Sequence, residues 1–281
     1  GGIDMYNPLL HQFSLIDPKQ ESNHDYGIIG PLIEYEGKIW IGTEGGGLAS
    51  YNLTTKEYQH FDLYNPNRGA LNSNTIKSLC VDRNGLLWIG TYAGGVQVFD
   101  IRSKRIVSYY SNFGGIDNNI VNDIFQDSRG NIWVGSNTSE GIHTKAHNSD
   151  HFMVGFDIQA NSTHVDFPWI RTICEPSTDE LWFGSIYNGI FIYKDGKTTR
   201  HISTANSDLT SDYISVIVED SEEQIWIGTY GGGVCIYDPQ TEVIQSLTTA
   251  NGLLNDNICS IIQDDYNTMW ISTVAGISKF S

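Results

Sequence analysis

The chain has 281 residues, of which 16 are Lys or Arg and 33 are Asp or Glu, so its formal net charge is −17. This charge argues against a nucleic-acid partner, because phosphate binding needs a basic surface. No apolar run reaches the ~18–20 residues of a membrane helix, so we expect no direct membrane insertion by this region. The 29 Gly, 15 Tyr, 11 Phe and 7 Trp favour an ordered all-β chain with many turns.

One pentapeptide, close to Ile-Trp-Ile-Gly-Thr, recurs along the whole chain. Its six copies are centred on a Trp and follow one another at intervals of 44 to 49 residues. The repeat tryptophans are Trp40, Trp88, Trp133, Trp182, Trp226 and Trp270. Six copies of five matched positions indicate a structural repeat, and we expect each repeat Trp to be buried between neighbouring units.

Each copy of the pentapeptide predicts four short strands, A to D, in chain order. An apolar strand A leads to a hairpin, whose acid stands six residues before the Trp of strand B. That acid is Asp in four copies, whereas Glu34 and Pro176 replace it in the other two. Asp can cap such a turn and a nearby Gly can adopt positive φ, as β-hairpins require. A glycine cluster, a strand C that ends in an aromatic residue, and strand D complete the unit. A unit of this kind is typical of a β-propeller blade.

The blades follow one another in a single β-propeller domain, 1–281. Residues 1–16 predict the end of a blade, and 257–281 predict a partial one. Complete blades are expected over 27–63, 75–110, 120–157, 169–203 and 213–248. If the strand from Leu10 to Ile16 completes the last blade, the ring has six blades. If the missing strands come from elsewhere, it has seven.

The blade formula resembles the two-component regulator propeller repeat, most clearly over Asp82 to Asp100 and Ile225 to Asp238. The resemblance implies the periplasmic sensor region of a hybrid histidine kinase for glycan utilisation. It also implies further domains of the same sensor chain, with the kinase located outside this non-catalytic region.

Three matched positions of the loop between strands B and C are predicted to carry a Tyr, namely Tyr92, Tyr187 and Tyr230. In a propeller this loop lies on the face where ligands usually bind. Tyr rings there can stack on sugar faces while their hydroxyls form hydrogen bonds. The alternative is a structural role, in which each ring packs against the glycine loop of the next blade.

Two cations, Lys77 and Arg171, stand at matched positions of strand A, which lines the central channel. They could bind a sulfate or carboxylate of the ligand. Alternatively they form salt bridges with Asp123, Glu175 or another channel acid. Trp169 is the only Trp outside the repeat, and we expect it on the same rim.

Other sequence features predict no cofactor and no metal site. The four cysteines, Cys80, Cys174, Cys235 and Cys259, form no CxxC pair and are interpreted as buried free thiols. His143, His147 and His151 are spaced by four, which would align them on a helix, but they fall in a region predicted as strand.

The sequence as a whole predicts a ligand-sensing propeller without catalysis that recognises an oligosaccharide. Binding would shift the geometry between domains, or within a possible homodimer. The alternatives are a propeller glycan lyase or hydrolase and a protein-interaction scaffold. An acid pair about 5–10 Å apart at the channel mouth would favour a hydrolase. A broad apolar patch would favour the scaffold.

Overall fold

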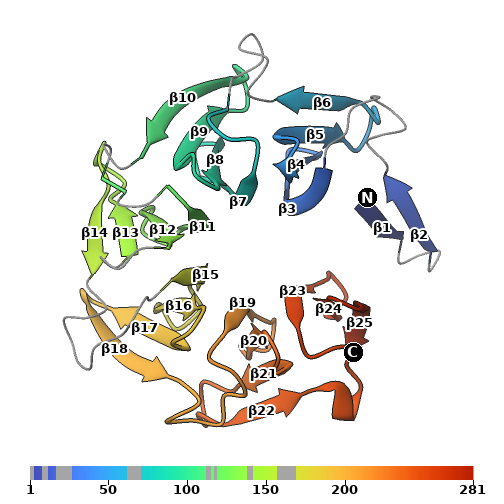
Figure 1. Ribbon diagram of the computed structural model, residues 1–281, viewed down its shortest axis with the longest axis vertical. Coiled ribbons are helices and arrows are strands. Elements are labelled where there is room, and N and C mark those ends of the chain that lie inside the picture. The colour runs from blue at the N-terminus through green and yellow to red at the C-terminus, as the bar shows by residue number, and fades with distance from the viewer. Residues whose placement is uncertain are drawn as a thin grey trace. The chain divides into compact units, whose positions relative to one another are not determined.

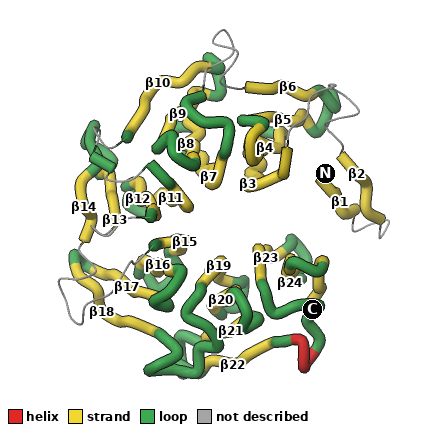
Figure 2. Tube along the Cα trace, viewed as in Figure 1, coloured by secondary structure: helices red, strands yellow, loops and turns green. Residues whose placement is uncertain are grey.

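The computed structural model describes residues 3–7, 12–16, 27–61, 71–111, 115–116, 119–137, 142–156 and 169–280. This part of the chain consists of β-strands and turns, with a single 3-10 helix, Thr249–Asn251, drawn in red in Figure 2. Within it, no helix has the length and apolar character needed to cross a membrane. The chain divides into two compact units, Gly1–Ile124 and Phe125–Ser281, and the boundary falls inside one strand.

The first unit contains a two-stranded pair and two four-stranded antiparallel sheets (Figure 1). The pair is β1 (Ile3–Asn7) with β2 (Gln12–Ile16). The first sheet comprises β3 (Gly27–Tyr35), β4 (Lys38–Gly45), β5 (Leu48–Asn52) and β6 (Tyr58–Phe61). The second comprises β7 (Ile76–Val81), β8 (Leu86–Thr91), β9 (Val96–Asp100) and β10 (Arg105–Tyr110).

The second unit begins within β11 (Val121–Gln126), whose sheet continues with β12 (Ile132–Ser136), β13 (Ile142–Lys145) and β14 (Met153–Phe156). The next sheet comprises β15 (Ile170–Cys174), β16 (Leu181–Ser185), β17 (Ile190–Lys194) and β18 (Lys197–Ile202). It is followed by β19 (Ile214–Glu219), β20 (Ile225–Thr229), β21 (Val234–Tyr237) and β22 (Ile244–Leu247). The last sheet has three described strands, β23 (Ile258–Gln263), β24 (Met269–Thr273) and β25 (Gly276–Phe280).

Each sheet is a meander in which strands pair in chain order, so the predicted strands A to D are its successive strands. The first strands of neighbouring sheets pack on one another, β3 on β7 in the first unit, and β15 on β19 and β19 on β23 in the second. The predicted fold class, an all-β propeller of four-stranded blades, is confirmed. Closure of the last blade by the strand from Leu10 to Ile16 stays a prediction, as does the choice between six and seven blades.

The hairpin Asp has two roles, of which the sequence predicted one. One carboxylate oxygen of Asp82 accepts the backbone N–H groups of Asn84 and Leu86 and so caps the turn. The other oxygen accepts the indole N–H of Trp88 at 2.9 Å. The same carboxylate–indole bond, at 2.7 to 2.8 Å, joins Asp127 to Trp133, Asp220 to Trp226 and Asp264 to Trp270.

The repeat Trp also joins its blade to the next one, because its ring packs on the aromatic residue of the next strand C. Ring centroids lie 5.2 to 5.7 Å apart in the pairs Trp40–Phe99, Trp133–Tyr193, Trp182–Tyr237 and Trp226–Phe280. The glycine two residues after the Trp belongs to the same junction. A Cβ on Gly184 would lie 2.6 Å from the side chain of Ile214 in the next blade, so that position has room for glycine only.

Two further tryptophans make other ring contacts. Trp88 stacks on Tyr110 of its own blade, at 6.0 Å and 8°, and the blade after it carries Lys145 in place of the aromatic residue. Trp270 is half-buried, with the ammonium group of Lys279 over its ring at 5.7 Å. The other five repeat tryptophans are buried.

The two blades without the hairpin Asp leave their indole N–H groups unpaired. Trp40 follows Glu34 and Trp182 follows Pro176, and both Nε1 atoms are buried with no hydrogen-bond partner among the described residues. A buried donor without a partner costs about 1–3 kcal/mol, so these two blades carry a local defect.

The Trp junction predicts a large loss of stability for Trp133→Ala. Removing this buried ring should lower the free energy of unfolding by about 3–5 kcal/mol, measured by urea denaturation. The same change at the half-buried Trp270 should cost less. Equal losses of unfolding free energy at the two positions would contradict the stabilising role given to the buried Trp between blades.

The unpaired indole of Trp182 predicts that Pro176→Asp stabilises the protein. The hairpin from Pro176 has the same length as the hairpin from Asp220, and both place an acid, Asp179 or Glu223, at positive φ. A carboxylate at 176 should therefore accept the indole N–H and raise the free energy of unfolding by about 1–2 kcal/mol. Pro176→Ala is the control, since it removes the proline without adding an acceptor. If the Asp variant is no more stable than the Ala variant, the explanation fails.

Candidate ligand-binding site

Two aromatic pairs lie at the loop ends of neighbouring blades in the second unit. Trp169, directly before β15, contacts Tyr187 in the loop after β16, with ring centroids 5.8 Å apart. Tyr213, directly before β19, contacts Tyr230 in the loop after β20 at 5.2 Å. Tyr187 and Tyr230 are 59% and 53% exposed, whereas Trp169 and Tyr213 are half-buried. Each pair therefore presents one exposed ring supported by another.

Backbone hydrogen bonds beside the rings define which loop positions are equivalent. The N–H of Tyr230 donates to the carbonyl of Tyr213, and the N–H of Ile186 donates to that of Trp169, both at 2.9 Å. Ile186 therefore occupies the position matched to Tyr230, and Tyr187 is the next residue. The prediction that the three Tyr residues occupy matched loop positions is therefore wrong by one residue for Tyr187.

Asp212 fixes the loop that carries Tyr213. Its carboxylate accepts the backbone N–H of Thr204 at 2.8 Å and the Thr204 hydroxyl at 2.7 Å. Its backbone carbonyl accepts the N–H of Gly189, which lies in the loop of Tyr187. One residue thus connects the loops of both aromatic pairs.

Gly189 makes this connection possible. It has φ of +69°, and a Cβ there would lie 2.2 Å from the carbonyl oxygen of Ile202. Asp256 repeats the arrangement in the next loop, where it accepts from Thr249 through its side chain and from Gly231 and Gly233 through its carbonyl. Because these loops are tied on both sides, the aromatic pairs are held in place before any ligand binds.

The two predicted cations lie at β-bulges, which turn a side chain away from the regular alternation of a strand. Lys77 is the extra residue between Ile76 and Ser78, and Arg171 is the extra residue between Ile170 and Thr172.

Lys77 forms an ion pair with Glu44 near the end of β4, so the structure favours the salt-bridge alternative for this residue. The acid is neither of the two named from the sequence: Asp123 accepts from Ser78, and Glu175 accepts from Ser128. Arg171 is exposed and forms no ion pair within the described ranges.

The six predicted ligand-binding residues divide between the two units. Tyr92, which is 50% exposed, and Lys77 belong to the first. Tyr187, Tyr230, Trp169 and Arg171 belong to the second. Tyr213 was not predicted as a site residue. It stands directly before strand A, as Trp169 does, and this matched position was a signal that could have identified it.

The cysteines only partly follow their prediction. All four are free, but only Cys235 is buried, and burial raises the pKa of its thiol. Cys80 and Cys174 are half-buried and Cys259 is exposed, so the expectation of four buried thiols is wrong for these three. Cys259 is exposed because it occupies the bulge position of β23.

No group of three His, Cys, Asp or Glu in the described ranges could hold a metal ion. His143 is buried on β13, while His147 and His151 are exposed in the turn before β14.

Comparison with known proteins identifies the repeat. Residues 70–93, 114–138, 208–231 and 252–275 match the family described as two component regulator propeller. These four segments therefore match the two-component regulator propeller repeat, as the sequence predicted. A search of curated proteins found no match.

Solved structures share the fold at low sequence identity. PorZ, a surface component of the type-IX secretion system of Porphyromonas gingivalis, matches with TM-score 0.70 and 18% identity over 90% of this chain and 38% of its own. The extracellular domain reported for a hybrid two component system of B. thetaiotaomicron matches with TM-score 0.63 and 18% identity, over 100% and 44%. A streptogramin B lyase matches with TM-score 0.72 and 16% identity, over 99% and 85%. The chain thus spans less than half the length of the first two.

Proposed function

We propose that this chain is the ligand-sensing propeller of a two-component signalling protein and that it binds an oligosaccharide. The observation that carries the proposal is the pair of tied aromatic contacts, Trp169–Tyr187 and Tyr213–Tyr230, on adjacent blades. Two exposed rings, each held by a second ring and by backbone hydrogen bonds, suit stacking on successive sugar faces. The repeat family supports the signalling role.

In this proposal the region lies in the periplasm as part of a longer sensor chain. The extracellular domain of the hybrid two component system, of which this chain matches 44%, supports that arrangement. Ligand binding would favour one geometry of the attached domains or of a homodimer over another, since a ligand acts only through different affinities for two states.

A binding role without catalysis fits the acids at the aromatic pairs. Asp212 and Asp256 each accept two hydrogen bonds from a Thr, and these bonds hold the loops. A glycosidase needs a pair of carboxyl groups that are available to the substrate. The lyase that shares the fold keeps the enzyme alternative open to test, because fold alone does not set function.

The proposal predicts that Tyr187→Ala weakens oligosaccharide binding by about 1–2 kcal/mol, because one exposed stacking ring is lost. Calorimetry on the full sensor chain, after a screen of neutral, sulfated and uronate-containing oligosaccharides, measures the effect. Tyr266→Ala is the matched control, since Tyr266 is 64% exposed in the hairpin between β23 and β24. Equal losses in both variants, or a screen without any binder, would contradict the proposal. Cleaved products after incubation would establish the enzyme alternative instead.

Arg171 predicts the charge of the ligand. As an exposed cation next to Ile170 and the Trp169 pair, it should favour an acidic or sulfated glycan, and Arg171→Ala should cost about 1–2 kcal/mol of binding. Lys77→Ala should cost less, because Glu44 already balances its charge. Affinity should also fall as salt rises. If neutral oligosaccharides bind equally well and salt has no effect, this role for Arg171 is wrong.

A further inference from the structure

A cavity lies in the second unit, at the hairpin ends of the blades that begin with β11 and β15. Its volume is about 240 Å³. This is below the ~300–1,000 Å³ typical of sites for drug-sized ligands, so the cavity would admit a group of about one sugar ring. Its walls include Met153, Leu181 and Tyr193, and its rim includes Arg129, Asp179 and Asp195.

The cavity arises where the third blade departs from its neighbour. In the blade of β15–β18, Arg200 pairs across the strands with Ile192, and its guanidinium lies over the ring of Tyr237 at 5.6 Å. In the third blade the corresponding position is Met153, opposite Thr144. Met153 is 62% exposed and lines the cavity together with Tyr193.

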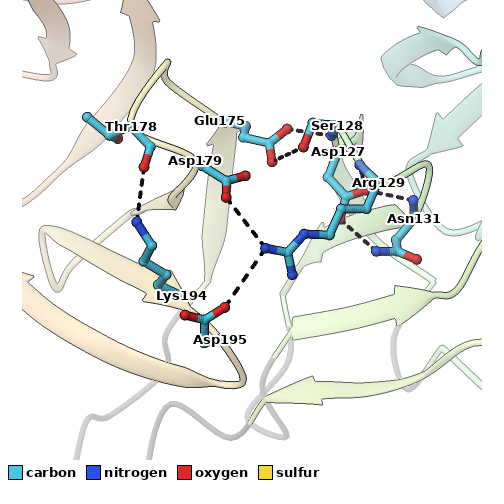
Figure 3. Close-up of polar contacts among 9 residues, drawn as sticks. All are labelled: Asp127, Ser128, Arg129, Asn131, Glu175, Thr178, Asp179, Lys194 and Asp195. Carbon is cyan, nitrogen blue, oxygen red and sulfur yellow. Dashed lines mark hydrogen bonds and ion pairs between the residues drawn. The ribbon is translucent and has the colours of Figure 1, made fainter.

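Most polar groups around the cavity already have partners and form a fixed frame (Figure 3). Asp127 accepts from Trp133 and Asn131. Glu175 accepts from the Ser128 hydroxyl at 2.9 Å.

Arg129 and its two acids are the exception. The guanidinium nitrogen Nη2 lies 3.5 Å from an oxygen of Asp179 and 3.9 Å from one of Asp195. Both separations exceed the ~2.7–3.2 Å of a direct N–H···O hydrogen bond. Within the described residues, these three side chains are 57% to 71% exposed and form ion pairs without a direct hydrogen bond between them.

A hydroxyl group fits such a gap, because it accepts a bond from the guanidinium and donates one to a carboxylate. Arg129, Asp179 and Asp195 together carry a net charge of −1, which disfavours an anionic ligand. Burial raises the pKa of the Tyr193 phenol, so this wall of the cavity stays uncharged.

We propose that this cavity is a second binding site that takes one neutral pyranose unit. The apolar walls contact the carbon face of the sugar, and Arg129 with Asp179 and Asp195 binds adjacent hydroxyls. The site is separate from the aromatic pairs at the loop ends, so it does not depend on the function proposed for them.

The indole N–H of Trp133 provides the readout, since Trp133 and Asp127 both line the cavity. In ¹⁵N-labelled protein, its signal is assigned with Trp133→Phe and followed during titration with methyl glycosides of glucose, galactose, mannose and xylose. We expect a saturable shift with at least one of them. If none produces a saturable shift, the proposal is overturned.

Arg129→Gln should lower, at least about fivefold, the affinity for the glycoside that binds, because a charge-assisted hydrogen bond is lost. Met153→Arg should abolish binding, because the arginine side chain would fill the cavity. Arg200 occupies the corresponding position in the next blade. Arg102→Gln, at an exposed turn of the first unit, is the matched control and should have no effect.

Two results would overturn the assignment of the ligand. Unchanged or tighter glycoside binding in Arg129→Gln would exclude the proposed role of the guanidinium. A saturable shift with the dication cadaverine that is larger than with any glycoside would identify a cation site. Tyr187→Ala, which tests the aromatic pairs, should leave this titration unchanged, so failure of one site is distinguishable from failure of the other.

Discussion

The bond between a hairpin Asp and the indole of its Trp is the interaction on which four of the six repeats depend. It fixes the turn and the ring at once, because one carboxylate serves both through its two oxygens. The ring, held at its nitrogen, can then pack on the aromatic residue of the next blade. Intrablade and interblade order are thus coupled through a single side chain.

This construction leaves the loops at the other end of the blades free to vary. Their order comes from the Asp–Thr bonds and the backbone bonds to glycine, none of which involves the exposed rings. The fold therefore does not depend on the rings of Tyr187 and Tyr230. Residues that the fold does not need can be selected for contact with a ligand. Arg171 gains the same freedom from its bulge, which releases it from the alternation of the strand.

The cavity at the hairpin end has a different origin. It exists because one blade departs from the repeat, with Met153 at the position where the next blade has Arg200. A repeat protein can acquire a site in two ways, through loops that the repeat does not constrain or through a local loss of the repeat. The two sites proposed here represent one of each.

The sequence by itself determined the repeat, the strand order and the fold class, because hydrophobic alternation and turn chemistry are local properties that recur in every copy. It also identified Tyr187, Tyr230, Trp169 and Arg171 as residues left over by the repeat. Only the tertiary structure decided that Trp169 meets Tyr187, that Tyr213 supports Tyr230 and that Lys77 is neutralised by Glu44. These contacts join residues 17 to 33 positions apart in the chain. Their formation depends on loop geometry and on the register of bulges, which no periodic pattern in one chain encodes.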